Sequence, residues 1–222
     1  MIIVYKNFFR NKMVNLSARS IRHFLPYAPI YCLSLYKENQ SEYDEQEPLD
    51  DEISVIYRQT KIVFNNGKPL DHVDSAQTAG YGNMDNAKVF SEGINLVQDY
   101  FKDVNDKVLV LAEDHFFTTG VVINELIEHD FDFAYAGWDH EHDVNGSILC
   151  LRPKRLQHLF PIDENGSHVE SHLRHHIKEK VPTDRLYCIQ NRTGPDYKGD
   201  GCLLYTSPSP RDRTRSRMPS SA

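Results

Sequence analysis

The sequence predicts one α/β domain in which helices flank a mostly parallel central sheet. Short apolar, β-prone runs alternate along the chain with segments of helical periodicity, the pattern of a sheet built from strand-helix-strand units. The run KVLVLA, residues 107–112, is apolar at every position after its lysine, as expected of a strand buried on both faces. At 222 residues, the chain has the length of one domain and can bury about 70% of its unfolded surface.

The first part of the chain predicts a strand, a helix and a second strand, at residues 1–5, 14–25 and 30–35. Helical spacing predicts a helix face made of Leu16, either Ser20 or Ile21, and Phe24. Pro26 ends this helix, because proline has no backbone N–H to continue it. A strand, a helix and a strand in succession form the first unit of a parallel sheet.

An acidic segment without an apolar pattern, residues 37–52, predicts a solvated loop. Two further short strands are expected at residues 53–57 and 61–64. The sequence Asn-Asn-Gly at 65–67 then supplies a turn, since these residues tolerate the backbone angles that turns require.

A long helix is expected to begin with Asp85 or Asn86 as its N-cap, because Asp and Asn side chains accept hydrogen bonds from the first free N–H groups. Its apolar stripe is formed by residues spaced three or four apart: Phe90, Ile94, Val97 and Phe101. The strand at residues 107–112 follows directly.

The second half of the chain continues the alternation. Thr118 or Thr119 is expected to cap a helix that runs through Val122, Leu126 and Ile127. The remaining predicted elements are strands at 131–137, 147–151 and 185–189, a short helix after Pro153, and a helix near 169–180.

Residues 202–222 differ in composition from the rest of the chain. They are rich in Ser, Pro and Arg and have no apolar periodicity after Tyr205, so they are predicted to be disordered. The segment also resembles the translation of a sequencing-library adapter, which indicates a non-native tail on a domain of residues 1–201 that is truncated at its C-terminus. The alternative is a genuine basic tail that binds nucleic acid or a membrane.

The chain is acidic, with a net charge of −7 at neutral pH. The 202–222 segment contains four arginines and one aspartate, so the rest of the chain is more acidic still. Proteins that bind nucleic acid usually carry a basic field that neutralises phosphates. The charge balance therefore argues against a nucleic-acid partner.

Outside the tail the cysteines are Cys32, Cys150 and Cys188, an odd number without a CxxC spacing. They are expected to be structural thiols in a reducing compartment. No segment approaches the roughly 20 apolar residues of a membrane span, so we expect no transmembrane segment. Together these features predict a cytoplasmic protein.

Three polar residues, Glu113, Asp114 and His115, follow the buried strand at 107–112 directly. In an open parallel sheet, ligands bind beyond the carboxyl ends of the strands. Two carboxylates about 4 Å apart repel each other by roughly 4 kcal/mol at an effective dielectric constant of 20. A divalent cation that bridges to a diphosphate would remove this repulsion, and an imidazole shifts the preference toward Mn²⁺. The alternative is a solvated junction between a strand and a loop.

With this acidic motif, the chain resembles the GT-A fold glycosyltransferases, whose nucleotide-sugar site ends a central strand with such a motif. The segment NLSARSIRHFLPYAPIYCLSL resembles their first helix and second strand, and GNMDNAKVFSEGIN resembles the helix before the motif. The resemblance implies a Rossmann-like sheet, a nucleoside diphosphate sugar donor, and Mn²⁺ or Mg²⁺ as cofactor. It implies that Glu113 faces the nucleotide and that Asp114 and His115 hold the metal, with His115 standing where the family usually has Asp.

The resemblance also nominates residues for the nucleotide. Tyr5 and Lys6, at the end of the first strand, would lie near the base and ribose. Asn83 or Asn86 would contact the nucleotide, although helix capping is the simpler explanation, since an Asn at a helix start needs no ligand to explain it.

The segment NGSILCLRPKRLQHLFPIDE resembles the part of these enzymes that forms the acceptor side. The resemblance implies a carboxylate at the start of the following helix, which removes the proton of the acceptor hydroxyl. Glu170 is the nearest match, and Asp139 and Glu141 are competing bases. The acceptor would be a glycan or another molecule with a hydroxyl group.

The sequence thus predicts a metal-assisted glycosyltransferase, with two alternatives. A catalytically inactive GT-A-like binding domain is suggested by the departures from the family pattern at His115 and Ser171. A metal-dependent hydrolase is suggested by histidines at spacings that can bind zinc: His140, His142, His172, His175 and His176.

Overall fold

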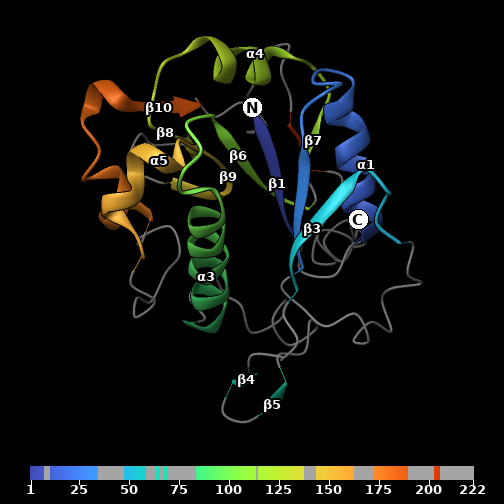
Figure 1. The fold of residues 1–222 in the computed structure, drawn as a ribbon, viewed down its shortest axis with the longest axis horizontal. Coiled ribbons are helices and arrows are strands. Elements are labelled where there is room, and N and C mark those ends of the chain that lie inside the picture. The colour runs from blue at the N-terminus through green and yellow to red at the C-terminus, as the bar shows by residue number, and fades with distance from the viewer. Residues whose placement is uncertain are drawn as a thin grey trace, which may run out of the picture.

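A computed structural model describes the following residues of the chain: 1–7, 11–34, 48–58, 64–65, 68–69, 84–113, 115–137, 144–162, 173–189 and 203–205. The predicted α/β architecture is confirmed. A seven-stranded sheet has the order β10-β8-β9-β6-β1-β2-β3, and helices flank it (Figure 1). Its strands are β1 (Ile2–Asn7), β2 (Ile30–Ser34), β3 (Ile53–Arg58), β6 (Val108–Ala112), β8 (Phe133–Gly137), β9 (Val144–Leu151) and β10 (Leu186–Ile189).

The sheet is mostly parallel, as predicted. The parallel pairs are β1 with β2, β1 with β6, β2 with β3, and β8 with β10. The exception is β9, which lies between β6 and β8 and is antiparallel to both. It begins at Val144, three residues earlier than the sequence predicted, and its register with β8 shifts between Tyr135 and Ala136.

Helices cover both faces of the sheet. The helices are α1 (Asn11–Arg22), α3 (Met84–Phe101), α4 (Val121–Glu128) and α5 (Pro153–Leu156), with 3₁₀ turns at Gln157–Leu159 and Thr183–Arg185 and a π-helical turn at Arg174–Lys178.

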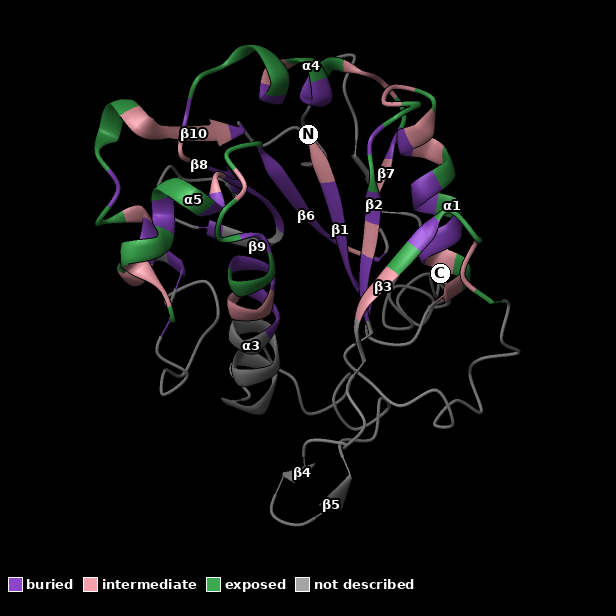
Figure 2. Ribbon diagram, viewed as in Figure 1, coloured by how far each residue is buried: buried purple, intermediate pink, exposed green. Residues whose placement is uncertain are grey.

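The core consists of two clusters, one on each face, because successive strand residues point to opposite sides. Ile3 and Tyr5 of β1 belong to the cluster that α1 and α4 cover. Val4 belongs to the cluster that α3 and α5 cover. Figure 2 shows the central strands β1 and β6 almost entirely buried, as the run at 107–112 predicted.

The buried face of α1 differs from the prediction at Leu16 and confirms it at Ile21. Leu16 is 41% exposed, whereas Val14, Ser17, Ala18 and Ile21 are buried. The helix therefore packs on the sheet through Val14, Ala18 and Ile21, and its polar Ser17 is accommodated because its hydroxyl is hydrogen-bonded. Hydrophobicity alone favoured Leu16.

Two predicted helix caps were wrong. The α3 helix begins at Met84, so Asp85 and Asn86 lie within its first turn. The N-cap of α4 is Gly120, and no side chain caps it, so neither Thr118 nor Thr119 has that role. The close approach of Phe24 explains the glycine: a Cβ atom at Gly120 would lie 3.1 Å from Cδ1 of Phe24.

The apolar stripe of α3 is confirmed at Ile94, Val97 and Phe101, all of which are buried. The side chain of Phe90 lies outside the described residues. Two short strands, β4 (Phe64–Asn65) and β5 (Lys68–Pro69), pair antiparallel on either side of residues 66–67, where the sequence predicted a turn.

The strand β11 (Leu203–Tyr205) pairs antiparallel with β7 (His115–Phe117). Three residues of the segment that was predicted to be disordered therefore form a strand, because LLY is the one apolar run in it. The rest of 202–222 lies outside the described residues, and its non-native origin stays a prediction. Cys32, Cys150 and Cys188 are free thiols. Among the described residues, no helix combines the length and hydrophobicity that crossing a membrane needs.

Candidate functional site

The parallel pairing of β1 and β6 brings two charged residues to one edge of the sheet. Lys6 lies in register with Ala112, and Glu113 follows Ala112 directly. Both are buried: Lys6 is 0% exposed and Glu113 is 6% exposed. A buried charge needs a partner to persist, and each of these two residues has one. The carboxyl ends of the central strands therefore carry charged groups of both signs.

The start of α3 faces the same edge. Tyr5 points to the side of the sheet that α1 covers, so the next residue, Lys6, points to the side that α3 covers. The α3 helix leads into the beginning of β6 and therefore runs opposite to it, which places its N-terminus toward the strand ends (Figure 1). Free N–H groups at a helix N-terminus favour a nearby anion.

Asn7 ends β1 and links it to the first helix. It is 1% exposed, and its Nδ2 donates to Oδ1 of Asn11, the first residue of α1, at 2.7 Å. Across the sheet Asn7 lies in register with Ser34, the last residue of β2. The ends of β1 and β2 and the start of α1 thus share one region.

The segment after Glu113 is held against α1 by hydrogen bonds. The Ser17 hydroxyl donates to the backbone carbonyl of His115. The backbone N–H of Phe117 donates to Oγ of Ser20 at 3.2 Å. Because Ser17 has one hydroxyl proton and gives it to His115, the Tyr5 hydroxyl is the donor in its 2.8 Å contact with Ser17. A directed chain of hydrogen bonds therefore joins β1, α1 and the acidic motif.

The phenol of Tyr5 stays protonated in this network. Burial raises the pKa of Tyr5 above its ordinary value, and this effect outweighs the lowering by the hydrogen bond to Ser17. Tyr5 is 0% exposed and belongs to the core cluster on the α1 side. The sequence nominated this residue for a base and ribose, and in this conformation its side chain contacts protein.

His115 is also buried, at 2% exposure, and it begins β7. It lies on the same strand face as Phe117, which belongs to the cluster that α1 covers. Its imidazole therefore faces the protein interior in this conformation.

Among the described residues, no group of three or more His, Cys, Asp or Glu side chains is arranged to hold a metal ion. Asp114, the central residue of the motif, lies outside those residues, as do Asn83, Asp139, Glu141 and Glu170. Asn86 lies in the first turn of α3, and its side chain is outside the described part. The assignments of these residues to nucleotide, metal and catalysis stay predictions.

Histidines that suggested a hydrolase are only partly described. His140, His142 and His172 lie outside the described residues. His175 is exposed, and its Nδ1 lies 3.2 Å from Oε2 of Glu179 on the next turn. This contact is a surface pair one helical turn apart, which is a common arrangement without a metal.

Sequence reasoning missed Ser17, and it placed Ser20 on the packed face of the helix without predicting its hydrogen bond to the segment after Glu113. They are spaced i and i+3 on the helix that also buries Val14, Ala18 and Ile21, so they share its packed side. The sequence offered one signal for them, namely serines at helix positions whose spacing places them toward the core. A buried hydroxyl needs a hydrogen-bond partner, so such serines are expected to bond to a neighbouring segment.

Solved structures share this fold. The glycosyltransferase GlyE of Streptococcus pneumoniae TIGR4 is 13% identical, with a TM-score of 0.50 over 86% of this chain and 46% of that chain. A putative glucose-1-phosphate thymidylyltransferase of Bacillus anthracis, solved in complex with a sucrose, is 11% identical, with a TM-score of 0.51 over 100% of this chain and 98% of that chain.

The chain spans 46% of the length of GlyE and nearly all of the thymidylyltransferase. No protein-family model matches the sequence, and no curated protein matches it. The chain therefore has the GT-A fold, a Rossmann-like, mostly parallel sheet flanked by helices that is found in glycosyltransferases and nucleotidyltransferases.

Proposed function

We propose that the protein transfers a sugar from a nucleoside diphosphate sugar to a hydroxyl acceptor, at the edge formed by the ends of β1 and β6. The observation that carries this proposal is the burial of two charged residues, Lys6 and Glu113, at the carboxyl ends of adjacent parallel strands. Ligands of open α/β sheets bind at this edge. The likeness to GlyE and to the thymidylyltransferase supports the proposal at the level of the fold.

Each end of the donor meets a different group in this proposal. Glu113 accepts hydrogen bonds from the nucleoside, and the positive charge of Lys6 together with the N-terminus of α3 favours the diphosphate. Asn83 or Asn86, near that N-terminus, contacts the nucleotide. Asp114 and His115 are the residues that would hold Mn²⁺ or Mg²⁺. When bound, the ion would neutralise charge on the departing diphosphate.

The hydrogen-bond chain from Tyr5 through Ser17 to the His115 carbonyl has a positioning role. It ties the backbone just after Asp114 to both β1 and α1. A metal ligand must be held to within a fraction of an ångström, and contacts behind the ligands usually supply this precision.

The transfer step needs a base for the acceptor. Glu170, or Asp139 in second place, takes the proton of the acceptor hydroxyl. The hydroxyl oxygen then bonds to the anomeric carbon, while the bond from that carbon to the diphosphate oxygen breaks and its electron pair leaves with the diphosphate. The acceptor is a glycan or another molecule that carries a hydroxyl group.

Calorimetric titration of the full chain with UDP, GDP, CDP and TDP, each with and without Mn²⁺, tests the donor site. We expect one nucleotide to bind, to bind more tightly with Mn²⁺, and to lose this binding in Glu113→Gln and in Asp114→Ala. Asp184→Asn is the matched control, because Asp184 is exposed in a 3₁₀ turn before β10. A folded chain that binds none of the four nucleotides contradicts the proposal.

The fold of this chain matches that of the thymidylyltransferase over nearly the whole length of both chains, which favours nucleotidyl transfer as a second candidate function. The same titration with nucleoside triphosphates and glucose 1-phosphate separates the two. Tight binding of a triphosphate with release of pyrophosphate favours this second function, and release of a nucleoside diphosphate from a nucleotide sugar favours the first. Nucleotide binding without either product indicates an inactive binding domain.

A further inference from the structure

Three successive residues are buried at the carboxyl end of β1, and α1 holds the two outer ones. The Tyr5 hydroxyl donates to Oγ of Ser17 at 2.8 Å. Nδ2 of Asn7 donates to Oδ1 of Asn11 at 2.7 Å. The residue between them is Lys6. We propose that Asn7 is a positioning residue, whose hydrogen bond to Asn11 fixes the end of β1 so that the Lys6 ammonium meets the diphosphate of the donor. This inference rests on the proposed function and names a further residue of the same site.

The side chains of these three residues alternate between the two faces of the sheet. Tyr5 and Asn7 point to the side that α1 covers, and Lys6 points to the side that α3 covers. The hydrogen bonds to α1 therefore fix the backbone before and after Lys6. The direction of the Lys6 Cα–Cβ bond follows from this backbone, so the position of its ammonium group depends on contacts made by its neighbours.

The pairing of β1 with its neighbouring strands ends at different residues on its two sides. The register of β1 with β6 ends at Lys6. Its register with β2 extends one residue further, to Asn7. Strand ends open more readily than strand interiors, because fewer contacts hold them. The hydrogen bond from Asn7 to Asn11 therefore stabilises β1 at the point where its pairing with β6 ends.

The helix α1 also holds the segment that follows the acidic motif. Hydrogen bonds join the side chains of Ser17 and Ser20 to the backbone of β7. One helix is therefore bonded both to the end of β1 and to the backbone just after the motif. Groups that bind one ligand together must be held within about 0.5 Å of their working positions. The bond between Asn7 and α1 thus sets the position of Lys6 relative to the motif.

A role that acts through Lys6 has a specific consequence for binding. The charge of Lys6 acts on the diphosphate and not on the nucleoside, so loss of the Asn7–Asn11 bond should weaken binding of the diphosphate alone. In a protein that already lacks the Lys6 charge, the same loss should have little further effect, because no ammonium is left to position. A bond that only stabilised the fold would act equally in both backgrounds.

The test is calorimetric titration of the full chain, in the presence of Mn²⁺, with UDP, GDP, CDP and TDP and with the matching nucleosides. The proteins compared are the unsubstituted chain, Asn7→Ala, Lys6→Met and the double variant. We expect Asn7→Ala to weaken binding of the preferred diphosphate about three- to tenfold and to leave the affinity for its nucleoside unchanged. The double variant should bind the diphosphate within about twofold of Lys6→Met alone.

A second asparagine variant keeps the test valid if Asn7→Ala does not fold. Asn11→Ala removes the same hydrogen bond from the partly exposed start of α1. It should reproduce the effects of Asn7→Ala on the diphosphate and on the nucleoside. Asn124→Ala, at an exposed position of α4, is the control for the loss of an asparagine and should change neither affinity.

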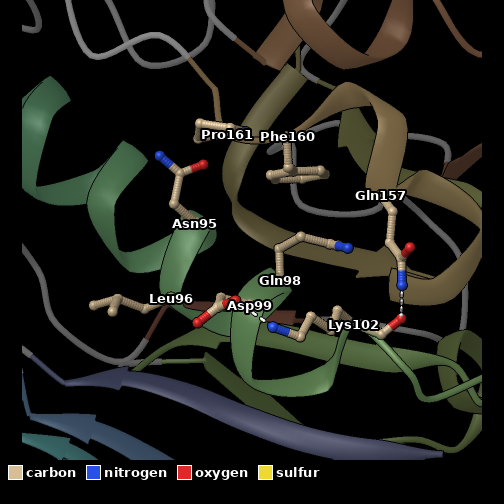
Figure 3. A pocket seen from close by; sticks show the side chains of 8 residues that line it. All are labelled: Asn95, Leu96, Gln98, Asp99, Lys102, Gln157, Phe160 and Pro161. Atoms are coloured by element: carbon tan, nitrogen blue, oxygen red, sulfur yellow. Dashed lines mark hydrogen bonds and ion pairs between the residues drawn. The ribbon is translucent and has the colours of Figure 1, made fainter.

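The control for the loss of a lysine charge lies at the far end of α3. Lys102 directly follows this helix and lines a pocket of about 600 Å³, where its Nζ lies 3.0 Å from Oδ1 of Asp99 (Figure 3). The N-terminus of α3, at the other end of the helix, faces the strand ends that carry Lys6. Lys102→Met should therefore leave the affinity for the diphosphate unchanged.

The outcomes separate the positioning role from the donor site itself. Additive losses in the double variant, an equal loss for the nucleoside, or unchanged diphosphate affinity in both asparagine variants would overturn the positioning role. If Lys6→Met lowers the diphosphate affinity while Asn7→Ala and Asn11→Ala keep it, the donor site is supported and the positioning role is wrong. If the unsubstituted chain binds none of the four diphosphates, both are wrong.

Discussion

The ammonium nitrogen of Lys107 lies 2.6 Å from the carbonyl oxygen of Leu126. It also donates to the carbonyls of Ile127 at 2.9 Å and His129 at 2.6 Å. These are carbonyls at the C-terminal end of α4, which have no partner within the helix. Lys107, the residue before β6, therefore caps a helix that follows it in the chain and holds that helix against the sheet.

Lys107→Met should destabilise the protein by about 2–3 kcal/mol, because it leaves buried carbonyls without their charged donor. Burial lowers the pKa of Lys107 and so offsets part of the stabilisation. Urea unfolding of both proteins measures the difference. Lys180→Met, at an exposed position, is the control and should change the free energy of unfolding by at most about 0.5 kcal/mol. Equal effects of the two substitutions would contradict the capping role.

Ser17→Ala removes the centre of the hydrogen-bond chain, with its hydrogen bonds to the Tyr5 hydroxyl and to the His115 carbonyl. We expect a loss of about 1–3 kcal/mol in the free energy of unfolding, together with weaker nucleotide binding. Denaturant unfolding and calorimetry on the same samples measure both. Ser54→Ala, on the exposed side of β3, is the matched control. Destabilisation with unchanged nucleotide affinity would limit Ser17 to a structural role.

Lys6→Met tests the charge at the candidate site. The substitution keeps the apolar stem of a residue that is 0% exposed but takes the charge from its buried partner, so the variant should also be less stable. Affinity for the preferred nucleoside diphosphate should fall about tenfold, whereas affinity for the nucleoside alone should be unchanged. Paired calorimetric titrations give both values. An equal loss for the nucleoside would show that Lys6 does not act on the phosphates.

Asp130 should make stability sensitive to acid. Hydrogen bonds and charge from Arg185, at 2.7 Å and 3.2 Å, lower the pKa of Asp130 from 3.8 to about 2, with further lowering by Arg152 and Arg155. A carboxyl whose pKa is lower in the folded state stabilises the fold above its unfolded pKa. That stabilisation is lost as the pH falls through about 2.

Arg185→Met should therefore destabilise the protein at neutral pH, and the difference from the unsubstituted protein should shrink as the pH falls from about 4 to about 2. Unfolding by urea at a series of pH values measures this trend. Asp130→Asn removes the titrating carboxyl, so the change in the free energy of unfolding that Asp130 causes between about pH 4 and pH 2 should be absent in that variant. A difference between Arg185→Met and the parent that does not change with pH would contradict the account.

The packing of Phe24 against the start of α4 leaves little room for a side chain at Gly120. A Cβ atom there would lie 3.1 Å from the Phe24 ring, so the branched side chain of Gly120→Val should cost about 1–3 kcal/mol. In a Phe24→Ala background, the same substitution should cost clearly less, because the clash is gone. Thermal or urea unfolding of the four proteins in this double-mutant cycle gives the coupling. If the effects of Gly120→Val and Phe24→Ala on the free energy of unfolding simply add, the contact with Phe24 does not cause the destabilisation by Gly120→Val.

The sequence by itself determined the elements that depend on local patterns. The alternation of apolar runs predicted β1, β2, β6, β8 and β10 close to their observed positions, and the spacing of Ile94, Val97 and Phe101 predicted the buried side of α3. It also placed Glu113 at the carboxyl end of a buried strand, because strand ends can be recognised from the change of apolar to polar residues.

Only the tertiary structure decided which elements meet. The antiparallel insertion of β9 between β6 and β8, the hydrogen bond from Ser17 to a residue 98 positions away, and the capping of α4 by Lys107 all join distant segments. Packing between distant segments also decided that Tyr5 points inward and that Leu16 is exposed. Periodicity tells which residues share a face, whereas the partner of that face is chosen by packing and hydrogen bonding over the whole chain.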